Sequence, residues 1–273
     1  MARQRPVETF TERTPRVVSA VKLHRGAARR SAGRFLAEGA QAVREALADG
    51  GVHELFCTTD ALARHADLVS AAEHGGIAVS IVTDRAATAL SDTVTPQGIV
   101  AVCELVDVPL EQALQGAPQL VAMLVDAGEP GNAGSIIRVA DAAGADAVVL
   151  AGDSVDVHNG KCVRASTGSV FHLPVARHRD AFGAVQHARA GGLQVLAAAA
   201  DGELDLDDVD ELLRAPTAWL FGNEAHGLAP SAAAAADHRV RIPIHGRAES
   251  LNLATAAALC LYASARAQRR AAR

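Results

Sequence analysis

Residues 120–152 read LVAMLVDAGEPGNAGSIIRVADAAGADAVVLAG, and this stretch decides the fold class. Its first six residues are continuously apolar, as in a parallel strand that is buried on both faces. A Gly-rich loop follows, then a helical pattern over about 132–143 and a second apolar strand at 147–150. Strand, helix and strand in this order are typical of α/β proteins. We therefore predict a parallel sheet with helices on both faces.

The same alternation extends on both sides of this stretch. Towards the carboxyl end we expect strands at 193–199, 217–221 and 239–244, helices near 159–167, 180–190 and 207–213, and a long helix over about 250–270. Before it, a helical pattern begins at Phe35 and ends at the glycines 50–51, and a compact α/β unit follows, with strands at 52–58, 77–82 and 98–103. We therefore divide the chain into a basic flexible arm (1–30), a small α/β domain (31–105), a linker (106–118) and a larger domain (119–273).

Composition excludes several classes of protein. No apolar run reaches the ~18 residues that a membrane span needs. The first ten residues, MARQRPVETF, lack the apolar core of a secretion signal, so we expect a cytoplasmic protein. The four cysteines are singly spaced, and the 11 histidines show no HxH or HExxH pattern. We therefore expect no metal site and no disulfide.

Charge is unevenly distributed along the chain. The formal net charge is -5, yet residues 1–34 carry nine Lys and Arg residues against Glu8 and Glu12. Such a cluster on an acidic protein favours contact with nucleic-acid phosphates, because basic side chains gain from counterion release. A solvated terminal tail explains the same charges equally well. The candidate phosphate contacts are Arg25, Arg29, Arg30 and Arg34.

The Gly-rich loop after the strand at 120–125 invites a dinucleotide-binding interpretation. It reads Asp126-x-Gly128-x-x-Gly131-x-x-Gly134, which is not the spacing of a Rossmann phosphate loop, and no acidic residue ends the next strand. A nucleotide-binding oxidoreductase is therefore disfavoured. The loop also places Asn132 and Arg138 on the following helix. We expect Asn132 to cap that helix and Arg138 to project from it, although an ordinary cap and a surface ion pair would give the same pattern.

Two more polar motifs follow predicted strands. Phe221-Gly222-Asn223-Glu224-x2-Gly227 comes directly after the strand at 217–221, where Gly222 permits a close approach of backbone to a ligand. Ile242-Pro243 and then Ser250-Leu251-Asn252 follow the next strand, and Ser250 is a good amino-terminal cap for the last helix. Ligands of parallel α/β folds bind at the carboxyl ends of strands, so these motifs predict one shared site.

In this order, Asn132-x5-Arg138, Gly222-Asn223-Glu224 and Ser250-Leu251-Asn252 resemble the three signature motifs of the SpoU/TrmH family of RNA ribose 2′-O-methyltransferases, over about 119–265. Residues 31–105 are similar to the ribosomal-protein-like, substrate-binding domain of many members, on the sequences RFLAEG (34–39) and TPQG (95–98). The resemblance implies a sheet whose carboxyl end is tied in a trefoil knot, S-adenosylmethionine (SAM) as methyl donor without a metal, and a homodimer.

The resemblance also assigns roles to individual residues. It implies that Gly222, Ile242, Leu251 and the backbone near Ala199 line the SAM pocket. It implies that the catalytic and RNA-facing residues are Asn132, Arg138, Glu224, Ser250 and Asn252. A guanidinium stays protonated, so Arg138 suits an electrostatic clamp on phosphate and alkoxide better than a base. In that arrangement Glu224 orients Arg138, while Ser250 and Asn252 position the ribose and the donor.

Three interpretations of the function remain open from the sequence: two differ in the RNA substrate, and one is not an enzyme. The amino-terminal domain favours ribosomal RNA, because compact members of the family that modify tRNA usually lack such a domain. A tRNA ribose 2′-O-methyltransferase is the alternative enzyme. A non-catalytic RNA-binding module is the alternative outside enzymes, supported by the basic arm and residues 31–105.

Overall fold

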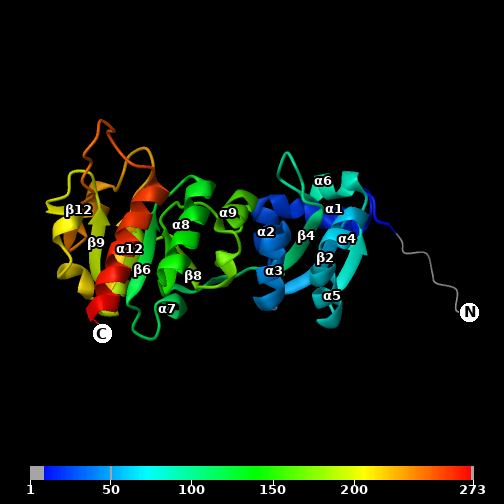
Figure 1. Ribbon diagram of the computed structural model, residues 1–273, viewed down its shortest axis with the longest axis horizontal. Coiled ribbons are helices and arrows are strands. Elements are labelled where there is room, and N and C mark those ends of the chain that lie inside the picture. Colours follow the sequence, from blue (N-terminus) through cyan, green and yellow to red (C-terminus); the bar gives the residue numbers. More distant parts are fainter. Residues whose placement is uncertain (1–8, 50, 272–273) are drawn as a thin grey trace, which may run out of the picture. The chain divides into compact units, whose positions relative to one another are not determined.

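The computed structural model describes residues 9–49 and 51–271, which form two compact units (Figure 1). The amino-terminal unit comprises the chain up to Leu105 together with His158–Phe171. The carboxyl-terminal unit comprises Val106–Val157 and the chain from His172 onwards. In the described ranges, none of the helices combines the length and the apolarity that crossing a bilayer requires.

The amino-terminal unit is built on a four-stranded sheet in the order β1-β4-β2-β3. Strand β4 runs antiparallel to both of its neighbours, and β2 and β3 are parallel. The strands are β1 (Arg34–Glu38), β2 (Val52–Cys57), β3 (Ala78–Ile81) and β4 (Ile99–Glu104). The helices that follow β1 in this unit are α3 (Ala40–Asp49), α4 (Thr59–Arg64), α5 (Ala66–His74), α6 (Asp84–Leu90) and α9 (Gly160–Ser166).

Strand β1 corrects the predicted helix that was to begin at Phe35. Successive side chains of β1 point to opposite faces of the sheet, and both faces are covered. Phe35 lies against the rings of His158 and Phe171, with centroids 4.8 and 5.9 Å away, whereas Leu36 belongs to the apolar cluster on the other face. A strand buried on both sides gives a continuous apolar run, which periodicity does not distinguish from a helix. Helix α3 starts only after Gly39, whose φ is 94°.

The expected flexible arm is also corrected, because its described part is folded. Helix α1 (Pro15–Val21), the 3-10 helix η1 (Lys22–His24) and helix α2 (Gly26–Ala32) lead directly into β1. Val17 and Leu23 are buried in one cluster with Leu36. Only three apolar side chains of this segment are buried, Val17, Ala20 and Leu23, and basic residues interrupt the helical pattern. Arg3 and Arg5 of the predicted arm lie outside the described residues.

The carboxyl-terminal unit contains an eight-stranded sheet in the order β10-β12-β9-β11-β6-β7-β8-β5. Every pairing in it is parallel, which confirms the predicted sheet. The strands are β5 (Asp107–Val108), β6 (Leu120–Val125), β7 (Ala147–Ala151), β8 (Val175–His178), β9 (Gln194–Ala198), β10 (Leu204–Asp205), β11 (Thr217–Phe221) and β12 (His238–Arg241). Strand β12 therefore ends three residues before the predicted limit at 244.

Helices cover both faces of this sheet, as predicted. On one face, Val121 and Met123 of β6 pack with side chains of α7 (Leu110–Ala113) and α10 (Ala181–Ala190). On the other, Trp219 of β11 donates from Nε1 to Ser264 Oγ of α12 (Leu253–Ala271) at 2.9 Å. The remaining helical segments are α8 (Pro130–Ala143), α11 (Pro230–Ala234), η2 (Ser169–Phe171), η3 (Leu206–Asp208) and η4 (Leu212–Arg214). The predicted helix at 207–213 is thus two short 3-10 turns.

One segment of the predicted larger domain folds with the amino-terminal unit. Helix α9 and η2 lie between β7 and β8 in sequence, yet His158–Phe171 belongs to that unit. Arg164 of α9 donates from Nη1 to Glu38 Oε2 at 3.1 Å and from Nη2 to the carbonyl of Asp92 at 3.1 Å. The side chains of Cys162 and Val163 are buried. The chain consequently passes between the two units three times.

Candidate active site at the strand ends of the carboxyl-terminal unit

Four loops leave the same edge of the parallel sheet. They follow β6, β9, β11 and β12, which are neighbours in the order β12-β9-β11-β6. The predicted motifs occupy three of these loops and the first turns of the helices behind them, and Ala199 lies directly after β9. Because carboxyl ends of parallel strands share one edge, the fold places these segments side by side.

Glu224 binds the Gly-rich loop that suggested a dinucleotide site. Its Oε2 accepts the N–H of Gly128 at 3.1 Å, and its Oε1 accepts the N–H of Glu129 at 3.2 Å. Oε1 also accepts the side-chain amide of Asn132 at 3.1 Å. Backbone N–H groups ahead of a helix bind anions readily. Here a carboxylate of the protein takes the place that a phosphate occupies in a Rossmann fold.

Asn132 joins the first motif to the third, and it does not cap its helix as expected. The cap of α8 is Glu129, whose side chain accepts the N–H of Asn132 at 2.9 Å. The carboxamide of Asn132 is therefore available for other contacts. It donates to Glu224, and its Oδ1 accepts Nδ2 of Asn252 at 3.0 Å. One residue from each motif thus enters a continuous hydrogen-bonded chain, Glu224–Asn132–Asn252.

Asn252, and not Ser250, caps the last helix. Its Oδ1 accepts the N–H groups of Ala254 at 2.9 Å and Thr255 at 3.3 Å, and α12 begins at Leu253. Ser250 precedes this cap by two residues and is exposed. The prediction of a helix that starts at Ser250 is therefore wrong by one turn. Asn and Ser are both good caps, so composition alone does not choose between them.

Gly222 is required by the turn itself. The loop after β11 folds back so that Asn223 and Gly227 exchange backbone hydrogen bonds of 3.0 and 2.9 Å. A Cβ atom on Gly222 would lie 2.3 Å from the carbonyl carbon of Gly227. We predicted that a ligand approaches the backbone closely at Gly222. In the structure, the backbone of Gly227 and Leu228 makes that close approach. Asn223 holds the turn, since its Oδ1 accepts the N–H of Ala225 at 2.9 Å and its Nδ2 donates to the carbonyl of Asp126 at 2.8 Å.

The pKa of Glu224 lies below its ordinary value. Partial burial on its own would raise this pKa. The opposing effects are larger together: hydrogen bonds from the backbone N–H of Glu224 itself, from the Asn132 amide and from the N–H groups of Gly128 and Glu129. All of these donors favour the charged form. Glu224 is therefore a carboxylate at neutral pH, suited to hold N–H groups and unsuited to donate a proton.

Asp126 is a contributor to the loop that the sequence did not reveal. It is a non-glycine residue with a φ of 55°, and its Oδ1 accepts the N–H of Asp153 at 2.8 Å. A Cβ atom on Gly152 would lie 2.2 Å from the same oxygen. The end of β6 is thereby fixed to the end of β7. Asp is enriched at positive φ, but it is also common in other conformations, so the residue type alone did not predict this turn.

Arg138 lies on α8, six residues after Asn132, and is exposed. The Glu224 carboxylate accepts hydrogen bonds from the loop N–H groups and from Asn132. An orientation of Arg138 by Glu224 therefore stays a prediction. An exposed guanidinium on the helix that also carries Asn132 is suitably placed for an anionic ligand.

The residues expected to hold the donor lie around the same edge of the sheet. A cavity of about 700 Å³ is lined by Ala199 with its neighbours, by His226 and Leu228, and by Asp201 and Arg239 among others. This volume is that of a small-molecule site. Gly222, Ile242 and Leu251 do not line this cavity. Leu251 is 37% exposed and Ile242 is partly buried, so apolar surface remains available on the loop after β12.

Of the four predicted RNA-contacting arginines, Arg29 is corrected. It is 5% exposed, and its Nη1 donates to the carbonyls of Leu23 and His24 at 3.0 Å each. Arg29 therefore supports the turn between η1 and α2. Arg25, Arg30 and Arg34 are exposed, as a phosphate contact requires.

Metal ligands do not assemble at this site. In the part of the chain that the structure describes, no group of three or more His, Cys, Asp or Glu side chains could hold a metal ion. All four cysteines are buried thiols. Burial, with a smaller effect from the charge of Glu73, raises the pKa of Cys57 to about 11.

Known protein families match both parts of the chain. Residues 119–262 match the model of the SpoU rRNA methylase family, and residues 14–101 match that of the MRM3-like substrate binding domain. The 23S rRNA (guanosine(2553)-2′-O)-methyltransferase RlmP of Bacillus subtilis is 35% identical over 242 residues, which are 88% of this chain and 92% of the relative. The 23S rRNA (uridine(2479)-2′-O)-methyltransferase of Streptomyces viridochromogenes is 42% identical over 140 residues, 50% of this chain and 49% of the relative.

The fold matches solved structures along almost the whole chain. The crystal structure of an AdoMet-bound rRNA methyltransferase from Sinorhizobium meliloti superposes with a TM-score of 0.83 at 31% sequence identity. The match covers 95% of this chain and 97% of that one.

Proposed function

The chain belongs to the SpoU rRNA methylase family, and we propose that it transfers a methyl group from SAM to a ribose 2′-hydroxyl of ribosomal RNA. The observation that carries this function is the hydrogen-bonded series Glu224–Asn132–Asn252. It brings together one residue from each signature motif at a single edge of the sheet. The two relatives named above are named as 23S rRNA 2′-O-methyltransferases, and the solved structure is named as an AdoMet-bound rRNA methyltransferase.

The donor site fits SAM in its size and its surface. The cavity beside Ala199 has the volume of a small-molecule site, and Leu251 offers apolar surface that an adenine ring can cover. We assign Ala199 to the part of the donor site that this cavity forms, and Gly222, Ile242 and Leu251 to the part that the neighbouring loops after β11 and β12 form. When bound, SAM supplies a methyl group that its sulfonium already activates.

The residues of the chain provide positioning and charge. Glu224 fixes the loop after β6, and with it Asn132 and the start of α8. Asn252 and Ser250 then face the ribose and the donor from the third motif. Arg138 clamps the RNA phosphate and stabilises the negative charge that builds up on the 2′-oxygen as the hydroxyl proton passes to solvent water. Positioning of two reactants can lower a barrier by roughly 7–11 kcal/mol, and we assign the main part of the catalytic effect to it.

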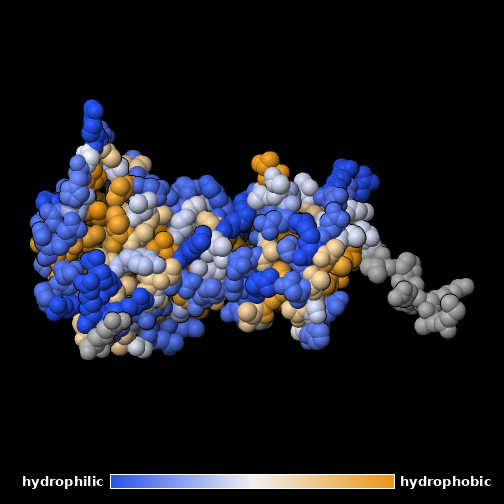
Figure 2. Space-filling model, in the orientation of Figure 1, coloured by the Kyte–Doolittle hydropathy of each residue, from blue (hydrophilic) through white to orange (hydrophobic). Residues whose placement is uncertain are grey.

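A homodimer is part of this proposal. Helix α12 exposes Leu259 and Tyr262, at 44% and 50% of their surface, beside Leu206 and Ala263. Figure 2 shows apolar residues gathered over the region of α12 and β9. We assign this face to a second copy of the chain, since exposed apolar patches of this kind usually mark interfaces. Size-exclusion chromatography with light scattering, on the wild type and on Tyr262→Glu, tests the assignment.

We further propose that the carboxyl end of the sheet is knotted. After β12 at one side of β9, the chain returns to pack α12 against α8, β6 and β11. This packing supports our proposal of the trefoil knot that the family resemblance implies. Ribosomal RNA is a cytoplasmic substrate, so we place the protein in the cytoplasm.

The substrate class is ribosomal RNA, and large-subunit RNA is the substrate that the relatives favour. Their names specify a guanosine and a uridine, so family membership does not fix the base. The amino-terminal unit, which matches a substrate binding domain, supports a structured RNA over a small acceptor.

The test uses the full-length protein with SAM and unmodified 23S rRNA, 16S rRNA or tRNA transcripts. After digestion to nucleosides, mass spectrometry should detect one 2′-O-methylated nucleoside from the 23S transcript. A product from tRNA alone would favour the alternative substrate. SAM binding without a product on any RNA would leave a binding module.

A further inference from the structure

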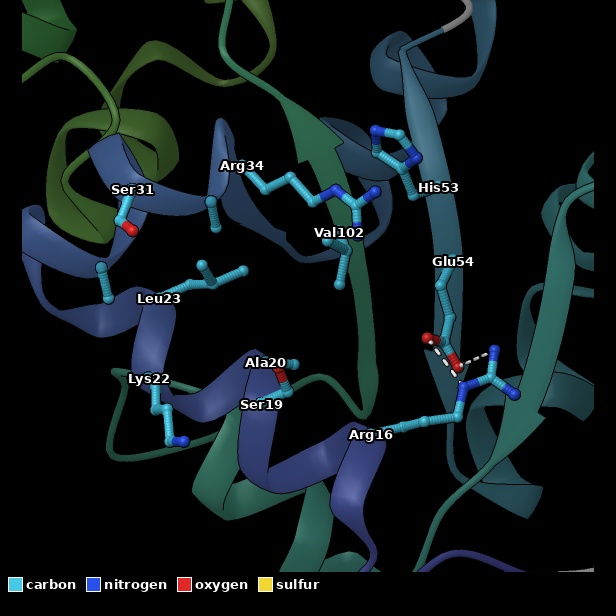
Figure 3. Close-up of a pocket in the computed structure, with 12 residues that line it drawn as sticks. Arg16, Ser19, Ala20, Lys22, Leu23, Ser31, Arg34, His53, Glu54 and Val102 are labelled. Carbon is cyan, nitrogen blue, oxygen red and sulfur yellow. Dashed lines mark hydrogen bonds and ion pairs between the residues drawn. The ribbon is translucent and has the colours of Figure 1, made fainter.

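A second cavity lies within the amino-terminal unit and is separate from the candidate active site (Figure 3). Its volume is about 570 Å³, and it opens between the α1–α2 segment and the sheet. The residues that line it are Arg16, Ser19, Ala20, Lys22, Leu23, Ala28, Ser31, Ala32, Arg34, His53, Glu54 and Val102. A volume in this range suits a ligand the size of one nucleotide or a small metabolite.

Positive charge dominates the cavity. Glu54 is its one acidic lining residue, and its carboxylate accepts Arg16 Nη2 at 2.8 Å, Arg16 Nε at 3.3 Å and Ser80 Oγ at 2.8 Å. That carboxylate is thereby neutralised. Lys22 and Arg34 are exposed and form no ion pair with any residue that the structure describes. In Figure 3 the Arg34 side chain runs along one side of the cavity, above Val102.

The floor of the cavity is apolar, and no Phe, Tyr or Trp lines the cavity; His53, which also lines it, pairs through Nε2 with Glu104 at 3.1 Å. Leu23 and Val102 are buried there, and Ala28 and Ala32 keep it open because their side chains are small. The hydroxyls of Ser19 and Ser31 can donate to a phosphate or a ribose. A ligand that fits has an anionic group and a compact, flat body. A base lying on this floor gains burial without stacking, which gives little preference for one base over another.

We propose that this cavity binds one unstacked nucleotide of the substrate RNA, with Lys22 and Arg34 contacting its phosphate. Unpaired bases in loops and bulges are the parts of an RNA that proteins can accommodate in pockets. The nine basic residues within the first 34 concentrate positive charge on an otherwise acidic chain, which favours a polyanion over an acidic peptide. The identity of the ligand as RNA rests on the proposed function.

Two double variants test the inference. Lys22→Ala/Arg34→Ala removes two charges from the cavity. The control, Arg44→Ala/Arg85→Ala, removes two charges from ion pairs with Asp67 and Glu12 that do not line it. The measurements are the Kd for an unmodified 23S rRNA transcript as a function of salt, the Kd for SAM, and the rate at saturating RNA.

We expect the cavity variant to bind RNA about 10-fold more weakly than the control at the same salt. The slope of log Kd against log salt should be smaller by roughly 0.7, the contribution of one single-strand phosphate. SAM affinity and the rate at saturating RNA should match the control. Ala28→Trp, which fills the cavity and keeps its charge, should weaken RNA binding in the same way.

Equal RNA affinity and equal salt slopes for the two double variants would overturn the inference, and binding of an acidic peptide at the cavity would then be the remaining interpretation. The two proposals fail separately. If the wild type methylates RNA while both double variants bind alike, only the cavity assignment is wrong. If the wild type binds RNA through the cavity but yields no methylated nucleoside, only the proposed reaction is wrong.

Discussion

Asn252 donates a hydrogen bond of 3.0 Å from its Nδ2 to the Oδ1 of Asn132, and the two residues stand at the beginnings of α12 and α8. Each helix start carries a partial positive charge from its unpaired N–H groups. The carboxylate of Glu224 lies beside the start of α8 and balances that charge. Glu224 thus holds the start of α8 directly, and Asn132 connects it to the start of α12.

Asn132→Ala should remove both of its side-chain bonds and loosen the contact between the first and third motifs. We expect turnover to fall by roughly 10²-fold, because small displacements of positioning residues have effects of this size. Ser135→Ala, three residues further along α8, is the matched control and should retain wild-type turnover. Single-turnover methylation at saturating SAM gives the comparison; equal rates for the two variants would exclude Asn132 from the site.

Glu224→Gln should destabilise the protein at neutral pH and much less in acid. The folded-state pKa of Glu224 lies below its unfolded value, which is about 4.3. Its stabilising effect is therefore fully present above that value and is lost as the pH falls through the folded-state pKa. Thermal melting at pH 7, 5 and 3.5 should show the difference in Tm between wild type and variant shrinking at the lowest pH. A difference that stays constant would contradict the role of the charge.

Arg138→Ala should leave SAM binding and dimer formation unchanged and should lower the single-turnover rate by about 10²–10³-fold, the usual effect of losing one preorganised donor. Arg138→Lys should recover only part of the rate, because an ammonium keeps the charge but loses the planar fork. The three proteins are compared on one 23S rRNA transcript. A near wild-type rate for Arg138→Ala would remove Arg138 from the catalytic residues.

Gly222→Ala and Gly246→Ala form a matched pair at the strand ends. A methyl group on Gly222 meets the carbonyl carbon of Gly227 at 2.3 Å, whereas one on Gly246 meets nothing within 4 Å. We expect Gly222→Ala to lower the free energy of unfolding by about 1–3 kcal/mol and to weaken SAM binding. Gly246→Ala should stay within about 0.5 kcal/mol of wild type. Urea unfolding and calorimetry with SAM measure both effects.

Arg29→Ala and Arg30→Ala separate a structural arginine from an exposed one in α2. Loss of Arg29 leaves the carbonyls of Leu23 and His24 without their guanidinium donor, which should lower the free energy of unfolding by about 2 kcal/mol. Arg30 is exposed, and its removal should change stability by less than about 0.5 kcal/mol. Urea unfolding is the measurement. Similar losses for both variants would mean that the buried bonds of Arg29 contribute little.

The sequence predicts the parallel sheet well because its strands are buried on both faces and read as apolar runs, as at 120–125. The same property misleads at β1, where Phe35 and Leu36 pack to opposite faces and resemble a helix. The segment 15–32 was missed since its three short helical pieces bury only a few apolar side chains among many basic ones.

The candidate site was predictable in its members but not in its contacts. Asn132, Glu224 and Asn252 follow strands whose ends meet, so their proximity could be expected. The partners of Glu224 could not, because backbone N–H groups carry no sequence signal. The caps were also mispredicted. The structure has Glu129 where we expected Asn132, and Asn252 where we expected Ser250, because several polar residues near a helix start can cap it.

The placement of His158–Phe171 has a consequence for how this protein can be divided or recombined. A gene fragment that begins at the linker would encode a methyltransferase carrying a helix, α9, whose buried side chains belong to a core that the fragment lacks. An exchange of substrate-binding domains between relatives would need two separate insertions, one before residue 106 and one between β7 and β8. The two halves are therefore not interchangeable modules, and changes in α9 and in the amino-terminal core must be compatible with each other.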